Sequence, residues 1–154
     1  MKWNKSTRFA LYAALEMARG GEGRVTASSV AAKYRISSHH LAKVLQQMVR
    51  SGLAAAVRGV GGGYRLARSA KEITLYDIVE IFEGAQDLSR CMLSDDSTPC
   101  SHPEACSVKK VFDEIEQQAY FTLKSIRLST LAASPAEKGS QIPATVVRKP
   151  IADR

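Results

Sequence analysis

The sequence predicts a mainly α-helical protein with one small β-hairpin, and three observations carry that prediction. Three amphipathic segments lie before residue 52, each with apolar residues at the i, i+3, i+4 spacing of a helix. A glycine-rich reversal then separates two short apolar runs, which is typical of a hairpin. After residue 106, apolar residues recur in alternating steps of four and three, the pattern of a helix that packs against a second helix.

The first three helices are expected close together in the chain. The first covers residues 6–19, and a run of glycines ends it. Thr26 is a good N-cap for the second helix, and Ser37 or Ser38 can cap the third. A turn of three residues separates the second helix from the third, which is the plan of a helix-turn-helix. The residues expected to face the core are Leu11, Ala14, Leu15 and Ala18 in the first helix, Ala27, Val30, Ala31 and Tyr34 in the second, and Leu41, Val44, Leu45 and Met48 in the third.

A hairpin is expected directly after the third helix. Residues 53–57 are small, apolar and partly β-branched, and residues 64–66 can pair back onto them. The glycines of 58–63 permit positive φ and therefore a tight reversal. The result is a wing beside the helix-turn-helix, with Arg58 and Arg65 on the two sides of its tip.

The second half of the chain predicts a connecting helix and one long helix. Thr74 and Asp77 have the spacing of a capping box at the start of the connecting helix, and Gly84 ends that helix. The long helix carries a seam made of Val108, Phe112, Ile115, Ala119, Thr122 and Ile126. We therefore divide the chain into a winged helix-turn-helix at 1–68, a connecting helix at 69–87, a cysteine loop at 88–106, a dimerisation helix at 107–133 and a disordered tail at 134–154.

The net charge of +7 is distributed unevenly. Residues 1–66 hold eleven lysines and arginines against two acidic residues, a net charge of +9, whereas residues 67–154 carry −2. A basic region joined to a mildly acidic one indicates a polyanion partner for the first region alone. No stretch approaches the ~18 apolar residues of a membrane span, and the chain starts without a signal-peptide core, so we expect a cytoplasmic protein.

The third helix has the composition of a recognition helix. A recognition helix presents long polar side chains opposite its apolar stripe, and here His39, Lys43, Gln46 and Arg50 share one line. Residues near the N-terminal end of such a helix normally reach the bases, while wing arginines meet phosphates or a minor groove. The residues expected to bind double-stranded DNA are Ser38, His39, His40, Lys43 and Gln47 in the helix and Arg58, Gly59 and Arg65 in the wing.

The three cysteines, Cys91, Cys100 and Cys106, lie within sixteen residues of one another. An odd number of cysteines in a reducing compartment argues against a disulfide framework. Clustered thiols indicate metal ligation or redox sensing, because thiolates bind zinc and iron–sulfur clusters. A zinc site needs a fourth ligand, for which His102 is the nearest candidate, but the paired C-x₂-C spacing of zinc ribbons is absent.

The order of these features resembles the Rrf2 family of bacterial transcription regulators. The resemblance rests on the helix-turn-helix, the run from Arg58 to Arg68, the run from Ile73 to Ile78 and the spaced cysteines, and it covers about residues 1–132. The family includes the iron–sulfur-cluster assembly regulator, the nitric-oxide-sensitive repressor and the rhizobial iron regulator. The resemblance implies a homodimer, joined through the long helix, that represses transcription from a palindromic operator.

The resemblance also implies an iron–sulfur cluster held by Cys91, Cys100 and Cys106, with 4Fe–4S favoured over 2Fe–2S. The state of the cluster would set the affinity for DNA, in response to nitric oxide, iron or redox state. Two departures from the family pattern leave the fourth ligand open. No histidine closely follows Cys106, and Arg8 stands where the nitric-oxide sensor has an acidic ligand. The candidates are His102, a group of the partner chain and a small molecule.

Two other functions stay open at this point. One is a cluster-free regulator in which the thiols act directly as a disulfide or small-molecule switch. The other is a structural zinc protein that acts as an adaptor between proteins. An enzyme is not expected, because the sequence contains no Walker loop, no H-E-x-x-H and no nucleophile elbow.

Overall fold

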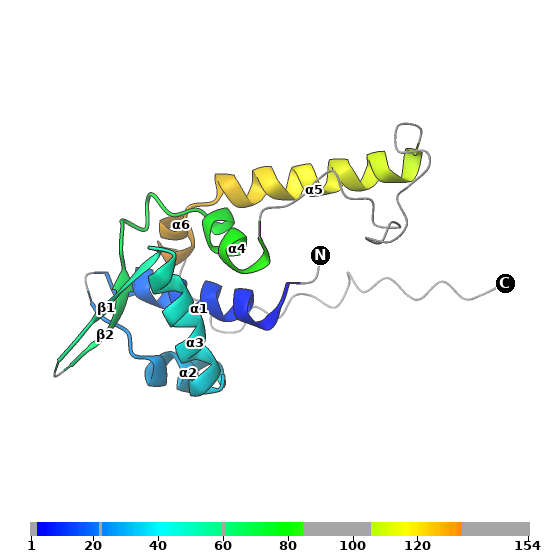
Figure 1. The fold of residues 1–154 in the computed structure, drawn as a ribbon. Helices are drawn as coiled ribbons and strands as arrows, with labels where there is room; N and C mark the ends of the chain where they lie inside the picture. Colours follow the sequence, from blue (N-terminus) through cyan, green and yellow to red (C-terminus); the bar gives the residue numbers. More distant parts are fainter. Residues whose placement is uncertain (1–2, 22, 60, 85–105, 134–154) are drawn as a thin grey trace, which may run out of the picture.

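The computed structural model describes residues 3–21, 23–59, 61–84 and 106–133, and Figure 1 shows their arrangement. In chain order the elements are α1 (Lys5–Arg19), α2 (Ala27–Tyr34), α3 (Ser38–Arg50), β1 (Ala54–Val57), β2 (Gly63–Leu66), α4 (Leu75–Glu83), α5 (Ser107–Ser125) and α6 (Leu128–Ala133). The mainly α-helical class with one small hairpin is therefore confirmed. Cys91, Cys100 and the predicted tail at 134–154 lie outside the described residues. None of the helices in the described part of the chain is long and apolar enough to cross a membrane.

Helix α1 lies at the centre of the domain, and α3, α4 and α6 pack against it. Its inward face consists mainly of alanine, and Ala10, Ala13 and Ala14 are fully buried. Small side chains let the crossing helices come close to one another. Most of the remaining core comes from Leu41, Val44, Leu45 and Met48 of α3, which confirms the predicted stripe, and from Leu53, Ile73, Ile78 and Leu128.

The predicted inward stripe of α1 is wrong by about one residue. Of the four residues expected there, Ala14 is buried, whereas Leu11, Leu15 and Ala18 are only partly covered. The leucines dominated the hydrophobic pattern, but the neighbouring helices approach α1 so closely that alanine occupies the inner position. Met17 is the one long side chain on the buried face.

Side chains cap the helices largely as predicted. Thr26 and Thr74 each form a complete capping box, at the starts of α2 and α4. Ser37, and not Ser38, is the N-cap of α3, with its side chain accepting a hydrogen bond from the backbone of the first turn. Asn4 caps α1, which therefore begins slightly earlier than predicted.

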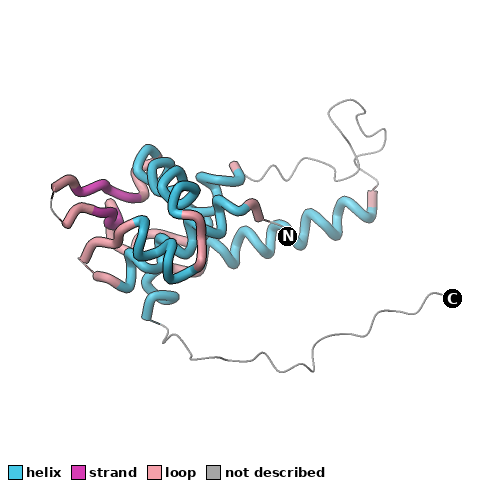
Figure 2. Tube along the Cα trace, turned by 90° about the horizontal axis from the view of Figure 1, so that it is seen from below, coloured by secondary structure: helices cyan, strands magenta, loops and turns pink. Residues whose placement is uncertain are grey.

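The wing is an antiparallel hairpin in which Ala54 pairs with Leu66. Val25 adds a bridge on its outer edge, with its N–H 2.9 Å from the carbonyl oxygen of Tyr64. A Cβ at Gly63 would lie 2.6 Å from the Val25 carbonyl oxygen, so this position has no room for a side chain. The predicted hairpin is confirmed, and the close approach of Val25 explains one of its glycines. Figure 2 shows the two strands at one end of the molecule.

The predicted single helix over residues 107–133 is two helices, because the chain is extended at Ile126. There the backbone pairs with the segment before α4: Leu75 N–H donates to the Ile126 carbonyl at 3.1 Å, and Leu128 N–H donates to the Ile73 carbonyl at 2.8 Å. These bonds replace helical ones, and they bury Leu128 against the core. The tertiary contact therefore ends α5 where no glycine or proline marks a break.

Glu16 joins α1 to α2 through its carboxylate. It accepts hydrogen bonds from Lys33 Nζ at 2.7 Å, from the Tyr34 hydroxyl at 2.8 Å and from Arg19 Nη1 at 3.3 Å. Burial raises the pKa of the Glu16 carboxyl, but these hydrogen bonds outweigh burial and leave its pKa below the usual 4.5. Burial and the bond to Glu16 raise the pKa of Tyr34 to about 12.

Replacing the carboxylate in Glu16→Gln should lower the free energy of unfolding at neutral pH by about 1 kcal/mol, since charge-assisted hydrogen bonds are lost. A carboxyl whose pKa is lowered by folding stabilises the protein above its unfolded pKa, so the deficit should shrink as the pH falls below about 4. The raised pKa of Tyr34 contributes to the free energy of unfolding in the alkaline range. This contribution is present below about pH 10 and is lost as the pH rises toward 12.

Urea unfolding of the natural protein and of Glu16→Gln across the acid range tests the prediction for Glu16. A deficit in Glu16→Gln that does not depend on pH would contradict it.

Candidate nucleic-acid interface

The exposed face of α3 carries a row of polar side chains. His39, Lys43, Gln46 and Arg50 are all exposed, and they lie opposite the buried stripe of this helix. Helical spacing of four, three and four residues places them in one line along the axis. Such a row has the length and the hydrogen-bonding groups to read base edges and to hold phosphates.

Several cations on α3 and the wing have no acidic partner among the described residues. Within the described ranges, no carboxylate lies within ion-pair distance of Lys43, Arg50, Arg58 or Arg65. By contrast, Lys33 and Arg19 are paired with Glu16, and Lys109 is paired with Asp113. Unpaired cations on one surface attract a polyanion most strongly.

Two of the predicted DNA-binding residues contact other helices of the same chain. His40 lies on the flank of α3, where its Nε2 is 3.3 Å from the Ser6 hydroxyl and its ring meets Phe9 edge-on at 5.0 Å between centroids. Gln47 lies on the same flank and donates from Nε2 to the carbonyl oxygen of Ile81 at 3.1 Å. Ser38 and His39 remain exposed at the start of the helix. A direct role of each of these residues toward DNA stays a prediction.

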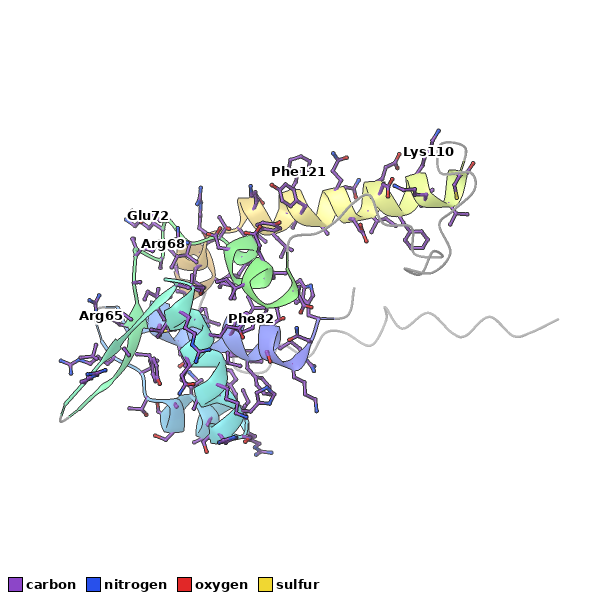
Figure 3. The ribbon with its side chains drawn as sticks, viewed as in Figure 1. Arg65, Arg68, Glu72, Phe82, Lys110 and Phe121 are labelled. Atoms are coloured by element: carbon purple, nitrogen blue, oxygen red, sulfur yellow. The ribbon has the colours of Figure 1, made fainter. Side chains whose placement is uncertain are left out.

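The wing presents its arginines beside this helix. Arg58 and Gly59 are exposed at the tip, and Arg65 lies on the outer side of β2, as Figure 3 shows. Behind Arg65 lies a groove of about 660 Å³, lined by Ala18, Gly21 and residues 65–70. Arg24 is not among the residues predicted from the sequence, but its Nη1 donates to the Gly61 carbonyl at 3.1 Å and so supports the wing tip. The sequence signal that could have identified Arg24 is its position directly before the β-branched Val25.

Cys106 is the one predicted metal ligand among the described residues. It is the N-cap of α5, with its half-buried Sγ accepting a hydrogen bond from Lys109 N–H at 3.4 Å. A helix N-terminus favours a negatively charged group, so a metal-bound thiolate fits this position. No three histidine, cysteine or acidic side chains form a metal site within the part of the chain that the structure describes.

Comparison with known families decides the class of protein. The family model named Rrf2, described as an iron-dependent transcriptional regulator, matches residues 3–134. The chain belongs to the Rrf2 family. It is therefore a DNA-binding transcriptional regulator, and the expected resemblance is confirmed.

The relatives of this Rrf2 protein are regulators and not enzymes. BadM of Rhodopseudomonas palustris, named as an HTH-type transcriptional regulator, is 43% identical over 132 residues, which are 85% of this chain and 81% of BadM. The structure of CymR, the global cysteine regulator of B. subtilis, has a TM-score of 0.71 at 27% identity and covers 86% of this chain and 96% of its own. The oxidised form of Staphylococcus aureus CymR has a TM-score of 0.70 at 26% identity, over 86% of this chain and 97% of its own.

If Lys43 and Arg58 contact phosphates or bases, Lys43→Ala and Arg58→Ala should each weaken DNA binding. Loss of one phosphate contact should also reduce the slope of log affinity against log salt by about 1. Fluorescence anisotropy with a labelled duplex at several salt concentrations measures both effects. Lys110→Ala is a matched control, because Lys110 lies on α5, far from the wing in Figure 3. Unchanged affinity in both variants would remove the assignment of this surface.

Proposed function

We propose that this Rrf2 regulator is a homodimeric repressor whose affinity for a palindromic operator is set by an iron–sulfur cluster. It acts in the cytoplasm, with the DNA that it binds. The row of unpaired cations on α3 and the wing is the observation that carries the DNA-binding surface. Two recognition helices held at a fixed spacing match the two half-sites of a palindrome.

An exposed apolar seam on α5 supports the dimer. Val108, Val111 and Ile115 are 54%, 54% and 52% exposed, and Phe112 is 39% exposed. These residues lie on one side of a helix that extends away from the rest of the domain in Figure 1. Apolar residues at steps of four and three bury well against the same face of a second copy. The second α5 is therefore the partner that this seam fits.

A charge in the middle of the seam should separate the two chains. Ile115→Glu places two carboxylates in the proposed dimer contact and should give a monomer in analytical ultracentrifugation. The same variant should also lose most of its operator affinity, because one chain reaches only one half-site. Gln117→Glu adds the same charge on the opposite side of α5 and should remain a dimer. A dimeric Ile115→Glu protein would show that the contact lies elsewhere.

The thiolates of Cys91, Cys100 and Cys106 are the ligands that would hold the cluster. A bound cluster supplies a group that reacts with nitric oxide, loses iron or changes oxidation state. The family description as iron-dependent supports this choice, as does the position of Cys106 at the N-terminus of α5. In the chain, Cys91 and Cys100 follow α4 and Cys106 precedes α5, so the three ligands would tie the recognition domain to the dimer helix. We propose a 4Fe–4S cluster, with His102 a candidate for the fourth ligand.

Anaerobic purification tests the cluster directly. The protein should be brown and contain iron and sulfide, and Cys106→Ser should lower both contents severalfold while leaving the fold intact by circular dichroism. Nitric oxide should bleach the absorbance of the natural protein and change its operator affinity. Protein that holds neither iron nor sulfide under anaerobic conditions would overturn the cluster.

A cluster-free thiol switch is the second candidate. The observation that favours it is the similarity to S. aureus CymR, for which the structure of an oxidised form exists. In that case, replacing the cysteines with serine should abolish the response of DNA binding to peroxide without changing the metal content. The iron measurement above separates the two candidates.

A further inference from the structure

The last turn of α4 is held from two sides by other helices. From α3, Gln47 Nε2 donates to the carbonyl oxygen of Ile81 at 3.1 Å. From the start of α1, Asn4 Nδ2 donates to the carbonyl oxygen of Phe82 at 3.1 Å, and Asn4 N–H donates to Glu83 Oε1 at 2.9 Å. The buried Thr7 hydroxyl also donates to Glu83. Figure 3 shows Phe82 at this junction of α4 with α1.

These contacts satisfy groups that a helix end leaves open. The last carbonyls of an α-helix have no partner within the helix, and α4 ends at Gly84 without a basic residue in its last turn. The side chains of Gln47 and Asn4 supply the missing donors. The end of α4 is therefore hydrogen-bonded both to the recognition helix and to the start of the helix at the centre of the domain.

Gln47 does not share the orientation of its neighbour Gln46. Successive residues of a helix point about 100° apart, so Gln46 lies in the row with Lys43 and Arg50 while Gln47 lies on the flank toward α4. The two side chains have identical chemistry and adjacent positions. They are therefore a matched pair of exposed glutamines, of which Gln46 lies in the row of polar side chains and Gln47 is hydrogen-bonded to α4.

We propose that Gln47 is a positioning residue, which couples the end of α4 to the recognition helix and reads no base. This inference rests on the proposed function, because it requires that α3 meets DNA. It also deepens that function: α4 leads in the chain to Cys91, and the Gln47–Ile81 hydrogen bond links the last turn of α4 directly to α3. A movement of the last turn of α4 would turn the recognition helix through this bond.

The first experiment compares Gln47→Met with Gln46→Met, since methionine keeps the length of the side chain but removes the amide donor. The probe is a duplex selected from a random pool by the natural protein, together with variants that differ from it at single base pairs. Gln47→Met should weaken binding to all duplexes by a similar factor, about fivefold, as expected for one lost hydrogen bond. Gln46→Met should instead change the preference at one base pair. A base-specific effect of Gln47→Met would overturn the proposal.

The second experiment uses the single tryptophan as a reporter. Trp3 packs against Tyr76 and Val79 of α4 and Leu123 of α5, beside the bonds of Asn4. Saturating DNA should shift the Trp3 emission in the natural protein and in Gln46→Met, but not in Gln47→Met. A merely structural role for Gln47 would leave this response in place. A response that persists in Gln47→Met, or that is absent from the natural protein, would contradict the coupling.

The outcomes also separate this inference from the proposed function. If the natural protein selects no duplex from the pool, the DNA-binding surface itself is wrong. If it selects one and Gln47→Met behaves like Gln46→Met, only the role of Gln47 fails. Both comparisons use the whole chain, and neither requires that the cluster be present.

Discussion

The close packing of α3, α4 and α6 on the alanine face of α1 is the constraint on which the rest of the structure depends. Ala10, Ala13 and Ala14 are fully buried, and a larger side chain at any of them would force the crossing helices apart. The recognition surface lies on α3, and the route to the cysteines leaves from α4. The two helices that the proposed signal connects, α3 and α4, therefore both pack on α1, which limits how far either helix can move alone.

The same α4 also sets the direction of α5, the helix that we propose forms the dimer. α5 packs on α4 through an aromatic contact, in which the rings of Tyr76 and Tyr120 meet edge-on at 4.7 Å and Lys124 Nζ lies 4.9 Å from the Tyr120 ring. In the proposed dimer, this contact would help to set the angle between each recognition helix and the axis of the pair. Since half-site spacing follows from that angle, a small change at α4 would then prevent both helices from docking together.

Short-range signals explain how much of this fold could be predicted from the sequence. The caps at Thr26 and Thr74 and the glycine-rich hairpin depend on residues within a few positions, so local patterns were sufficient. The features that local patterns did not predict depend on tertiary contacts. The break at Ile126 comes from backbone bonds to the segment before α4, and the Gln47–Ile81 hydrogen bond depends on where α4 folds back. For the cysteine site, the sequence supplies the donor types and the structure supplies the position of Cys106 alone.

The pairing of charges, more than their number, separates binding residues from structural ones. The net charge of +9 in residues 1–66 includes Arg19 and Lys33, which the fold uses to hold Glu16 between two helices. Of the other cations in the described ranges, Lys43 and Arg50 lie on α3 and Arg58 and Arg65 lie on the wing, where repulsion between unpaired cations costs stability in the free protein. An acidic partner with a flat surface could neutralise only part of these charges, because the row of side chains lies on α3 and the arginines lie on the separate hairpin of the wing. The DNA duplex offers a groove for the row and a phosphate backbone beside it for the arginines, so it satisfies both sets at once.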